Sequence, residues 1–334
     1  MHPANLNSPH SPTVVRDGAI IEEKGKAPGM NNRESFLREV KEAGRGLSAE
    51  SIVSEADRPI SLALIAEDAG KLRQMEGFFA PQLLGSRKAD QVRERLCFFV
   101  LPLRPSEQEG LLQLDLVVSS EGAAGEVQAM LPQIHVYSAK DPQSMVRRIL
   151  KEHWDLALPL AKNFLPFRQP VARRFMRSIA LENALFTVMA ATAKFLPAPL
   201  SLFSAVGGSS STSLFLTANQ MRLAFLIAAA HDSAVGFRVQ TGQVTAIAAA
   251  ALGWRSLAHD IERKVSPSNS LLAKGLLAFV ATYATGLALE QLHTLGRHMT
   301  REEKSVAYDH AYSVGSRVIE RFLDIKASRD LSRQ

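Results

Sequence analysis

The stretch ISLALIAEDAGKLRQMEGFF, Ile60–Phe79, reads as a buried strand, a turn and a helix. Its first part, ISLALIA, carries no charge, as is typical of a strand that is buried on both faces of a parallel sheet. In nucleotide-binding α/β proteins, a unit of this kind carries the phosphate loop. The stretch therefore bears on two questions: whether the chain forms such a sheet, and whether the sheet can hold a nucleotide.

Three more apolar runs follow, LCFFVLP (96–102), LDLVVSS (114–120) and QIHVYSA (133–139), separated by charged segments with helical character. This alternation predicts a small parallel sheet with covering helices. Beyond residue 141, Ala and Leu dominate and no strand pattern is visible. The predicted fold class is α/β plus all-α, with a small parallel sheet followed by a hydrophobic helical bundle.

Composition divides the chain further. We expect a disordered tail over 1–32, because this part is rich in Pro, Asn, Ser and Gly and lacks the apolar core of a secretory signal. An α/β domain over 33–141, basic linker helices over 142–178 and a hydrophobic helical domain over 179–325 should follow. The single cysteine, Cys97, has no possible disulfide partner within the chain, which suits a reducing cytoplasm.

The turn after the first strand can be compared with the phosphate loop G-x-x-x-x-G-K-[ST]. Gly70 and Lys71 match the end of that pattern and are the candidate phosphate-binding residues. However, Ile65 stands at the first glycine position, and Leu72 replaces the hydroxyl residue that holds Mg²⁺. The pattern is thus present only in degenerate form.

The same turn contains two carboxylates, Glu67 and Asp68, where phosphate oxygens would have to lie. Their negative charge opposes the binding of a triphosphate. We therefore expect no nucleotide and no other cofactor.

A second fragment, IHVYSAKDPQSMVRRIL, resembles the fifth motif of Era-like GTPases, in which a strand ends in Ser-Ala-Lys beside the guanine. The matching residues are Ser138, Ala139 and Lys140. The Asn-Lys-x-Asp motif is missing after LDLVVSS, and Asp-x-x-Gly is missing after LCFFVLP. The resemblance implies a GTPase-like fold that has lost its chemistry, a pseudo-GTPase.

The C-terminal half resembles domain of unknown function 697 from about Phe175 to Gly296. The matching features are TANQM (217–221), Ala- and Gly-rich middle helices, and a helix that ends in GLALEQL (286–292). That family is a bacterial hydrophobic helical domain often found after Era-like GTPase domains. The resemblance implies association with GTPase-like domains and with membranes.

The net charge of +6 is concentrated between residues 147 and 177, where eight Lys or Arg residues stand against two acidic ones. Such a stretch can be a solvated helix face or can contact an anionic membrane. Its aromatic residues do not interleave as in a nucleic-acid groove, so we expect no nucleic-acid partner. The candidate lipid contacts are Arg147, Arg148, Arg168, Arg173, Arg174 and Arg177.

Leu271–Leu289 has nineteen mostly apolar residues, close to the roughly 20 that span a bilayer, with Lys274 near one end. Small residues form a stripe along it, which suits close helix packing in lipid or in a tight soluble bundle. Both readings remain open. The stripe consists of Gly275, Ala278, Thr282, Thr285 and Gly286.

Polar residues also occur inside the predicted helices. Asn219 and Arg222 are three positions apart and share a helix face. We expect them to form a buried polar cluster that sets the helix register; the alternatives are that they line a ligand or ion site or lie exposed.

Histidines are numerous near the C-terminus, but His293, His298 and His310 are spaced by five and twelve positions. These spacings do not place two metal ligands one turn apart on one face, so we expect no metal site. No nucleophile elbow and no His-Glu-x-x-His pattern occurs, so we expect no catalytic residues.

These observations favour a non-catalytic, membrane-associated interaction protein at the cytoplasmic face of the cytoplasmic membrane. Its partners would be anionic lipid and either another protein or a second copy of itself. The alternative is a GTP-dependent switch with an unorthodox phosphate loop, and the alternative location is the cytoplasm.

Overall fold

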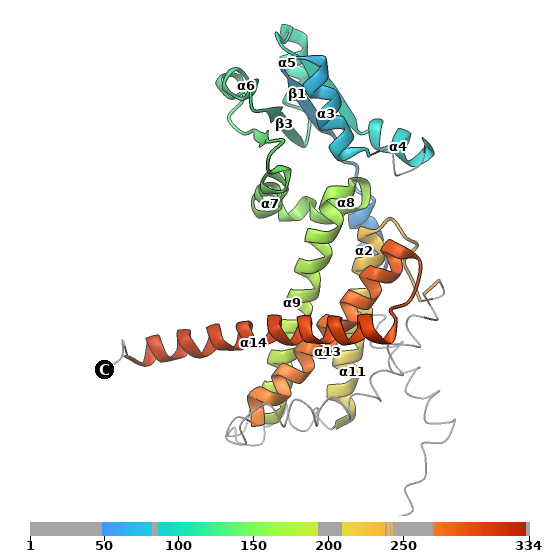
Figure 1. The fold of residues 1–334 in the computed structure, drawn as a ribbon, viewed down its shortest axis with the longest axis vertical. Coiled ribbons are helices and arrows are strands. Elements are labelled where there is room, and N and C mark those ends of the chain that lie inside the picture. Colours follow the sequence, from blue (N-terminus) through green and yellow to red (C-terminus); the bar gives the residue numbers. More distant parts are fainter. Residues whose placement is uncertain are drawn as a thin grey trace, which may run out of the picture.

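The computed structural model describes residues 49–81, 86–192, 209–237, 239–240, 242 and 270–331. The predicted tail over 1–32 lies outside the described residues. The described part is a mixed α/β protein in which a small parallel sheet and its helices sit at one end of a helical bundle (Figure 1).

The four strands form where the apolar runs predicted them. They are β1 (Leu62–Ala66), β2 (Leu96–Val100), β3 (Leu116–Ser120) and β4 (His135–Tyr137). All neighbours pair in parallel, in the order β2-β1-β3-β4. The chain moves from β1 to one side for β2 and then crosses to the other side for β3. The junction of β1 and β3 is therefore the switch point at which doubly wound sheets bind ligands.

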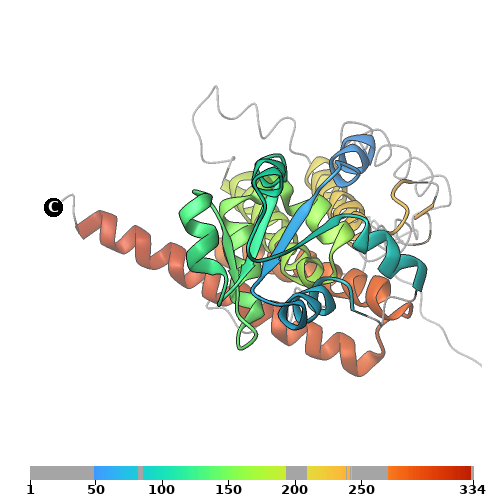
Figure 2. The same ribbon diagram turned by 90° about the horizontal axis from the view of Figure 1, so that it is seen from above.

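Alternate residues of β1 point to opposite faces of the sheet, as the twofold period of a strand requires. Ala63 and Ile65 pack against the layer that contains α5 and α6, whereas Leu62 and Leu64 face the larger core. Figure 2 shows α5 and α6 on one side of the strands and α3 on the other. The helices of this part are α3 (Ala69–Phe79), α4 (Ser86–Arg93), α5 (Pro105–Leu111), α6 (Ala124–Met130) and α7 (Pro142–Glu152).

The bundle is built around three long helices that pack against one another, α9 (Leu165–Thr192), α11 (Ser209–Ala230) and α13 (Ser270–Leu295). The 3₁₀ turn η2 (Trp154–Leu156) and α8 (Ala157–Asn163) lead into α9. The short α2 (Ala49–Ala56), which we expected in the α/β domain, packs against α8 and α11.

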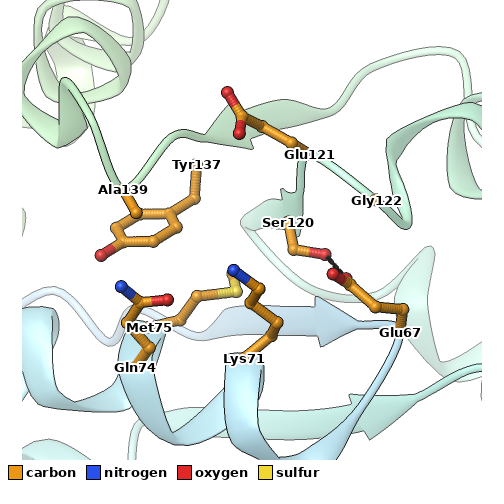
Figure 3. Close-up of a pocket in the computed structure, with 9 residues that line it drawn as sticks. All are labelled: Glu67, Lys71, Gln74, Met75, Ser120, Glu121, Gly122, Tyr137 and Ala139. Atoms are coloured by element: carbon orange, nitrogen blue, oxygen red, sulfur yellow. Dashed lines mark hydrogen bonds between the residues drawn. The ribbon is translucent and has the colours of Figure 1, made fainter.

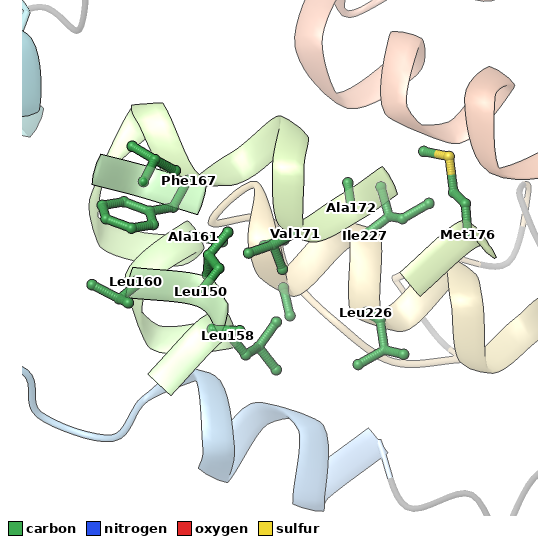
Figure 4. Close-up of a cluster of buried hydrophobic side chains, with 14 of the residues drawn as sticks. Leu150, Leu158, Leu160, Ala161, Phe167, Val171, Ala172, Met176, Leu226 and Ile227 are labelled. Atoms are coloured by element: carbon green, nitrogen blue, oxygen red, sulfur yellow. The ribbon is translucent and has the colours of Figure 1, made fainter. Parts of the chain in front are cut away.

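Sheet and bundle share one continuous core. Phe79 at the end of α3 meets Phe164 and Phe167 with ring centroids 5.8 and 6.3 Å away. Figure 4 shows the adjoining cluster, in which Leu150, Leu160, Val171 and Ile227 are among the buried side chains.

Two of the predicted boundaries fall inside this architecture. The boundary between 178 and 179 lies within the continuous helix α9, and α7, predicted as a linker helix, packs on β4.

Among the described helices, α13 is long and apolar enough to cross a membrane over Leu271–Leu295, yet 61% of its apolar window is buried by other parts of the chain. Its small residues allow close packing on α9. A Cβ atom at Gly286 would lie 2.5 Å from Cγ of Met176, and one at Gly275 would lie 2.8 Å from Cγ2 of Val188. The small-residue stripe therefore serves packing between helices of the same chain.

The last helix, α14 (Arg301–Leu331), crosses the middle of α13 at a steep angle (Figure 1). At the crossing, a Cβ atom at Gly315 would lie 2.8 Å from Cδ1 of Leu276 and 2.9 Å from Cδ1 of Phe279. Asp309 and Arg317 of α14 are exposed. If α13 were to span a bilayer in this arrangement, it would carry a charged helix into the hydrocarbon region, which is costly.

Candidate functional site

A small pocket opens at the carboxyl ends of β1, β3 and β4, at the switch point of the sheet (Figure 3). Its volume is about 150 Å³. Pockets that enclose a small-molecule ligand typically measure about 300–1,000 Å³, so a nucleotide does not fit without rearrangement. The pocket is lined by Glu67, Lys71, Gln74, Met75, Ser120, Glu121, Gly122, Tyr137 and Ala139.

The first turn of α3 is bound by its own chain. Asp68 is the N-cap residue, and its Oδ1 atom accepts hydrogen bonds from the backbone N–H of Gly70 at 2.6 Å and of Lys71 at 2.9 Å. These are the groups that a phosphate would use at a helix N-terminus. A carboxylate of the protein thus takes the position of an anionic ligand.

The second carboxylate of the turn, that of Glu67, connects the carboxyl ends of β1 and β3. Ser120, the last residue of β3, donates a hydrogen bond from its hydroxyl to the Glu67 carboxylate. The same carboxylate lies against Gly122, where an added Cβ atom would be 2.7 Å from Oε1. Gly122 therefore leaves the space that the Glu67 side chain fills.

The charges around the pocket disfavour an anion. Lys71 is the one cation among the lining residues, and its amino group points into the pocket in Figure 3. Glu67 and Glu121 line the same space, and Asp68 lies one turn away at the start of α3. Two carboxylates and one ammonium group among the lining residues leave a net negative charge.

The structure brings together part of the two predicted motifs. Lys71 and Ala139 line the same pocket, whereas Ser138 and Lys140 are not among its lining residues. The Ser138 hydroxyl instead accepts a 3.3 Å hydrogen bond from the backbone N–H of Lys140, which shapes the turn before α7. Gly70 contributes only its backbone N–H, which donates to the Asp68 carboxylate.

Ser120 and Tyr137 were missed in the sequence as pocket residues. The signal that could have found them is their position, since each lies at the carboxyl end of a predicted parallel strand. Tyr137 is buried, and this burial raises the pKa of its phenol. The hydroxyl is therefore uncharged at neutral pH.

No family model, curated protein or solved structure matches the chain. The resemblance to Era-like GTPases and to domain of unknown function 697 therefore remains a prediction from the residues quoted above.

The six arginines predicted to contact lipid do not form one free basic surface. Arg168 donates to the backbone carbonyls of Ala161 and Lys162, each at 3.2 Å. Arg174 donates to the carbonyl of Leu150 at 3.2 Å. These carbonyls lie near the ends of α8 and α7, where they have no partner within the helix and where the helix dipole favours a cation.

The other arginines divide between ion pairs and solvent. Arg173 lies 3.7 Å from the carboxylate of Glu290, and Arg147 lies 2.9 Å from that of Asp141. Arg174 also stacks over the ring of Trp154, 3.8 Å from its centroid. Arg148 and Arg177 are exposed. Four of the six arginines thus make contacts within the chain, although Arg147 and Arg174 are also exposed.

A buried polar network connects the three long helices. Asn183 of α9 accepts a 2.8 Å hydrogen bond from Asn219 of α11 and donates one of 2.8 Å to the hydroxyl of Thr282 on α13. Thr282 in turn donates to the carbonyl of Ala278 at 2.9 Å. All three linking side chains are buried, so the network specifies which faces of the helices meet.

Of the predicted polar pair, Asn219 belongs to this network and Arg222 does not. Arg222 is half-exposed and lies 3.4 Å from the carboxylate of Glu182 on α9. Three positions along a helix give a rotation of about 300°, so the two side chains diverge by about 60°. The long Arg222 side chain reaches the surface, which corrects the expectation that it is buried.

Replacing the central residue of the network should cost far more than replacing its surface neighbour. We expect Asn183→Ala to lower the free energy of unfolding by about 2–3 kcal/mol, because it leaves the buried Asn219 amide without its acceptor and removes the bond to Thr282. Arg222→Ala should lower it by less than about 1 kcal/mol, since it removes a half-exposed ion pair. Urea denaturation followed by circular dichroism measures both, and equal losses would contradict the role of the network.

The cap of α3 can be tested by separating its charge from its hydrogen bonds. We expect Asp68→Ala to lower the free energy of unfolding by about 1 kcal/mol, whereas Asp68→Asn should leave it nearly unchanged, because Asn caps a helix about as well as Asp. The same urea titration measures the difference. A loss in Asp68→Asn as large as in Asp68→Ala would show that charge, and not capping, is the main contribution.

Proposed function

We propose that the protein is a non-catalytic interaction protein that attaches to the cytoplasmic face of a membrane and presents a pseudo-GTPase domain to a protein partner. The observation that carries this proposal is the carboxylate of Asp68 bound to the first amides of α3, in the place of a phosphate. The domain is held in one state by its own side chain, so it needs no nucleotide to complete its fold.

Three features support the GTPase-like part of the proposal. The sheet is parallel, its order reverses beside β1, and the strand–turn–helix unit that would carry the phosphate loop stands at that reversal. A hydrophobic helical bundle follows, as the resemblance to domain of unknown function 697 implies. The interaction surface would then be the outside of the α/β domain, because the pocket at the switch point is small and the first amides of α3 are already bound by Asp68.

A GTP-dependent switch is the second candidate, and one observation favours it. Lys71 and Ala139, which come from the two motifs that resemble GTPase motifs, line the same pocket. For a nucleotide to enter, Asp68 would have to release two amides and Glu67 would have to release Ser120. A switch of this kind would need contacts with the outer phosphate that outweigh both losses.

The two candidates differ in nucleotide binding. We expect calorimetric titration of the full chain with Mg²⁺-GTP or Mg²⁺-ATP to show no binding at micromolar concentrations, because the amides are occupied and the local charge is negative. Asp68→Asn with Glu67→Gln removes the charge and keeps the hydrogen-bonding capacity, and should not restore binding. Mg²⁺-dependent GTP binding that is lost in Lys71→Ala would contradict the proposal and favour the switch.

The membrane part of the proposal rests on the end of the bundle that lies away from the sheet. Leu185 and Met189 lie one turn apart on α9 and are 44% and 67% exposed. Phe215 of α11 is also exposed and stacks on Phe186 of α9, with ring centroids 3.9 Å apart. We call Leu185, Phe186, Met189 and Phe215 the apolar end.

The sequence around the apolar end supports the same assignment. Residues 193–208, which connect α9 to α11, are predominantly apolar in sequence, although they lie outside the described residues. The ion pair between Glu182 and Arg222 lies beside the buried polar network of Asn183 and Asn219, on the sheet side of the apolar end. Leu271 at the start of α13 lies about 17 Å from Thr282 along the helix, at 1.5 Å per residue.

This length argues for attachment and not for a full crossing. It corresponds to about half of the 30 Å hydrocarbon core. Because the charged helix α14 crosses α13 near Leu276 and Phe279, deeper entry on that side would bury charge. Interfacial helices enter the headgroup and acyl boundary by about 5–10 Å, and a shallow insertion of this kind would bring the apolar end into contact with lipid without carrying the whole of α14 into the hydrocarbon.

Vesicle flotation tests this attachment. We expect the full chain to float with vesicles that contain anionic phosphatidylglycerol, and Leu185→Gln with Met189→Gln to reduce the bound fraction at least tenfold, since burying each side chain contributes about 1.5–3 kcal/mol. The matched control is Leu112→Gln at the end of α5, because Leu112 is 70% exposed but lies on the α/β part.

The control should bind like the unchanged chain. A chain that stays with the soluble fraction at physiological salt would contradict membrane attachment and leave a cytoplasmic interaction protein. Equal losses in both variants would indicate a general effect of exposed apolar side chains and would also contradict the role of the apolar end.

A further inference from the structure

A second cluster of functional groups lies at the amino end of β4, whereas the switch-point pocket lies at the carboxyl ends of the strands. His135 is the first residue of β4, Glu152 is the last residue of α7, and His153 follows it as the C-cap. One ligand atom from each residue lies within 4.8 Å of the other two. The cluster is therefore independent of the pocket on which the proposed function rests.

His135 is the unusual member of the cluster. Its residue is only 1% exposed, and neither ring nitrogen has a hydrogen-bond partner among the described residues. Buried polar groups in folded proteins are almost always satisfied, because desolvation without a compensating bond costs free energy. The imidazole of His135 therefore points to a missing partner.

The neighbours of His135 are both potential metal ligands. A Glu152 carboxylate oxygen, Oε2, lies 3.8 Å from Nδ1 of His135, too far for a hydrogen bond. The ring of His153 meets the ring of His135 edge-on, with centroids 5.4 Å apart. Burial lowers the pKa of His135 to about 4, so the ring is neutral at physiological pH, as a ligand must be.

We propose that His135, Glu152 and His153 bind a divalent transition-metal ion, with Zn²⁺ as the best match. Two imidazole nitrogens and one carboxylate oxygen are a common zinc ligand set, and three protein ligands leave a fourth position for water. The three residues occur on two adjoining elements, so the ion would tie the start of the edge strand β4 to the end of α7.

The geometry requires only a small contraction. Zinc bonds of about 2.0–2.2 Å in a tetrahedral site place the ligand atoms about 3.3–3.6 Å apart. The present spacing of up to 4.8 Å closes to this value by rotation of the exposed Glu152 side chain and the half-buried His153 ring. The buried His135 can remain where the strand holds it.

The surroundings allow the ion to enter and help to hold it. His135 and His153 line a groove of about 180 Å³ together with Gln133 and Asp115. The side-chain amide nitrogen of Gln133 lies 2.9 Å from Nε2 of His153. With Nδ1 of His153 as the ligand, Nε2 carries the proton, so the Gln133 amide would turn over for its oxygen to accept this N–H, as the outer partners of ligating histidines do. The positive charge of Arg148 acts on His135 and opposes a cation, but its side chain is exposed and its field is screened by solvent.

Metal titration of the purified full chain tests the proposal. After treatment with a chelator, competition with a coloured zinc indicator measures affinity and stoichiometry, and Co²⁺ supplies an absorption spectrum that reports tetrahedral coordination. We expect one Zn²⁺ per chain. Glu152→Gln and His153→Gln should each weaken binding at least about 100-fold, because loss of a ligand exceeds the roughly 10–100-fold effect of losing an outer partner.

The variants avoid His135 because its replacement can prevent folding. Circular dichroism of Glu152→Gln and His153→Gln checks that both fold, which is expected since neither residue is buried. The matched controls are Glu109→Gln and His298→Gln, which remove an exposed carboxylate and an exposed imidazole elsewhere and should keep full affinity.

Two results would overturn the proposal. One is the absence of Zn²⁺ binding tighter than about 100 µM in the unchanged chain, which corresponds to a binding free energy of about 5.5 kcal/mol. The other is equal Zn²⁺ affinity in the unchanged chain, Glu152→Gln and His153→Gln, which would place the ion on other residues.

Discussion

The contact of Phe79 with Phe164 and Phe167 is the constraint on which the rest of the structure depends. Phe79 ends the first strand–helix unit of the sheet, and the other two rings stand where the chain enters α9. Because α9 continues for 28 residues, or about 42 Å, this contact sets the direction of the whole bundle relative to the sheet. It also determines that the apolar end lies far from the α/β part.

Helix ends explain how three of the charged side chains are used within the chain. The first amides and the last carbonyls of a helix have no partner within it, and nearby side chains satisfy them. Asp68 does this at the start of α3, and Arg168 and Arg174 do it near the ends of α8 and α7. Side chains from the phosphate-loop-like turn and from the basic stretch thereby form hydrogen bonds with backbone groups of the same chain.

The two edges of the sheet differ in how their polar groups are satisfied. At the carboxyl edge, Glu67 and Ser120 bind each other and fill the switch point. At the amino edge, His135 is buried with both ring nitrogens unpaired among the described residues. At the switch point Glu67 and Ser120 satisfy each other, whereas the ring nitrogens of His135 have no hydrogen-bond partner among the described residues. Ligand binding in α/β proteins usually takes place at the carboxyl ends of the strands. In this chain the unsatisfied polar groups are instead those of His135, at the amino end of β4.

The sequence alone determined the four strands and the helices of the described part of the second half, because these follow from runs and periods within a few residues. It also predicted the burial of Asn219, but the same reasoning wrongly buried Arg222. Tertiary structure decided what each element meets. The carboxylate of Glu67 finds Ser120, 53 positions later, and His135 finds His153 across a helix. The tertiary structure also covers α13 with α9 and α14, although the length and composition of α13 alone would suit a bilayer. Local patterns encode backbone preference, whereas partners distant in the chain are chosen by packing.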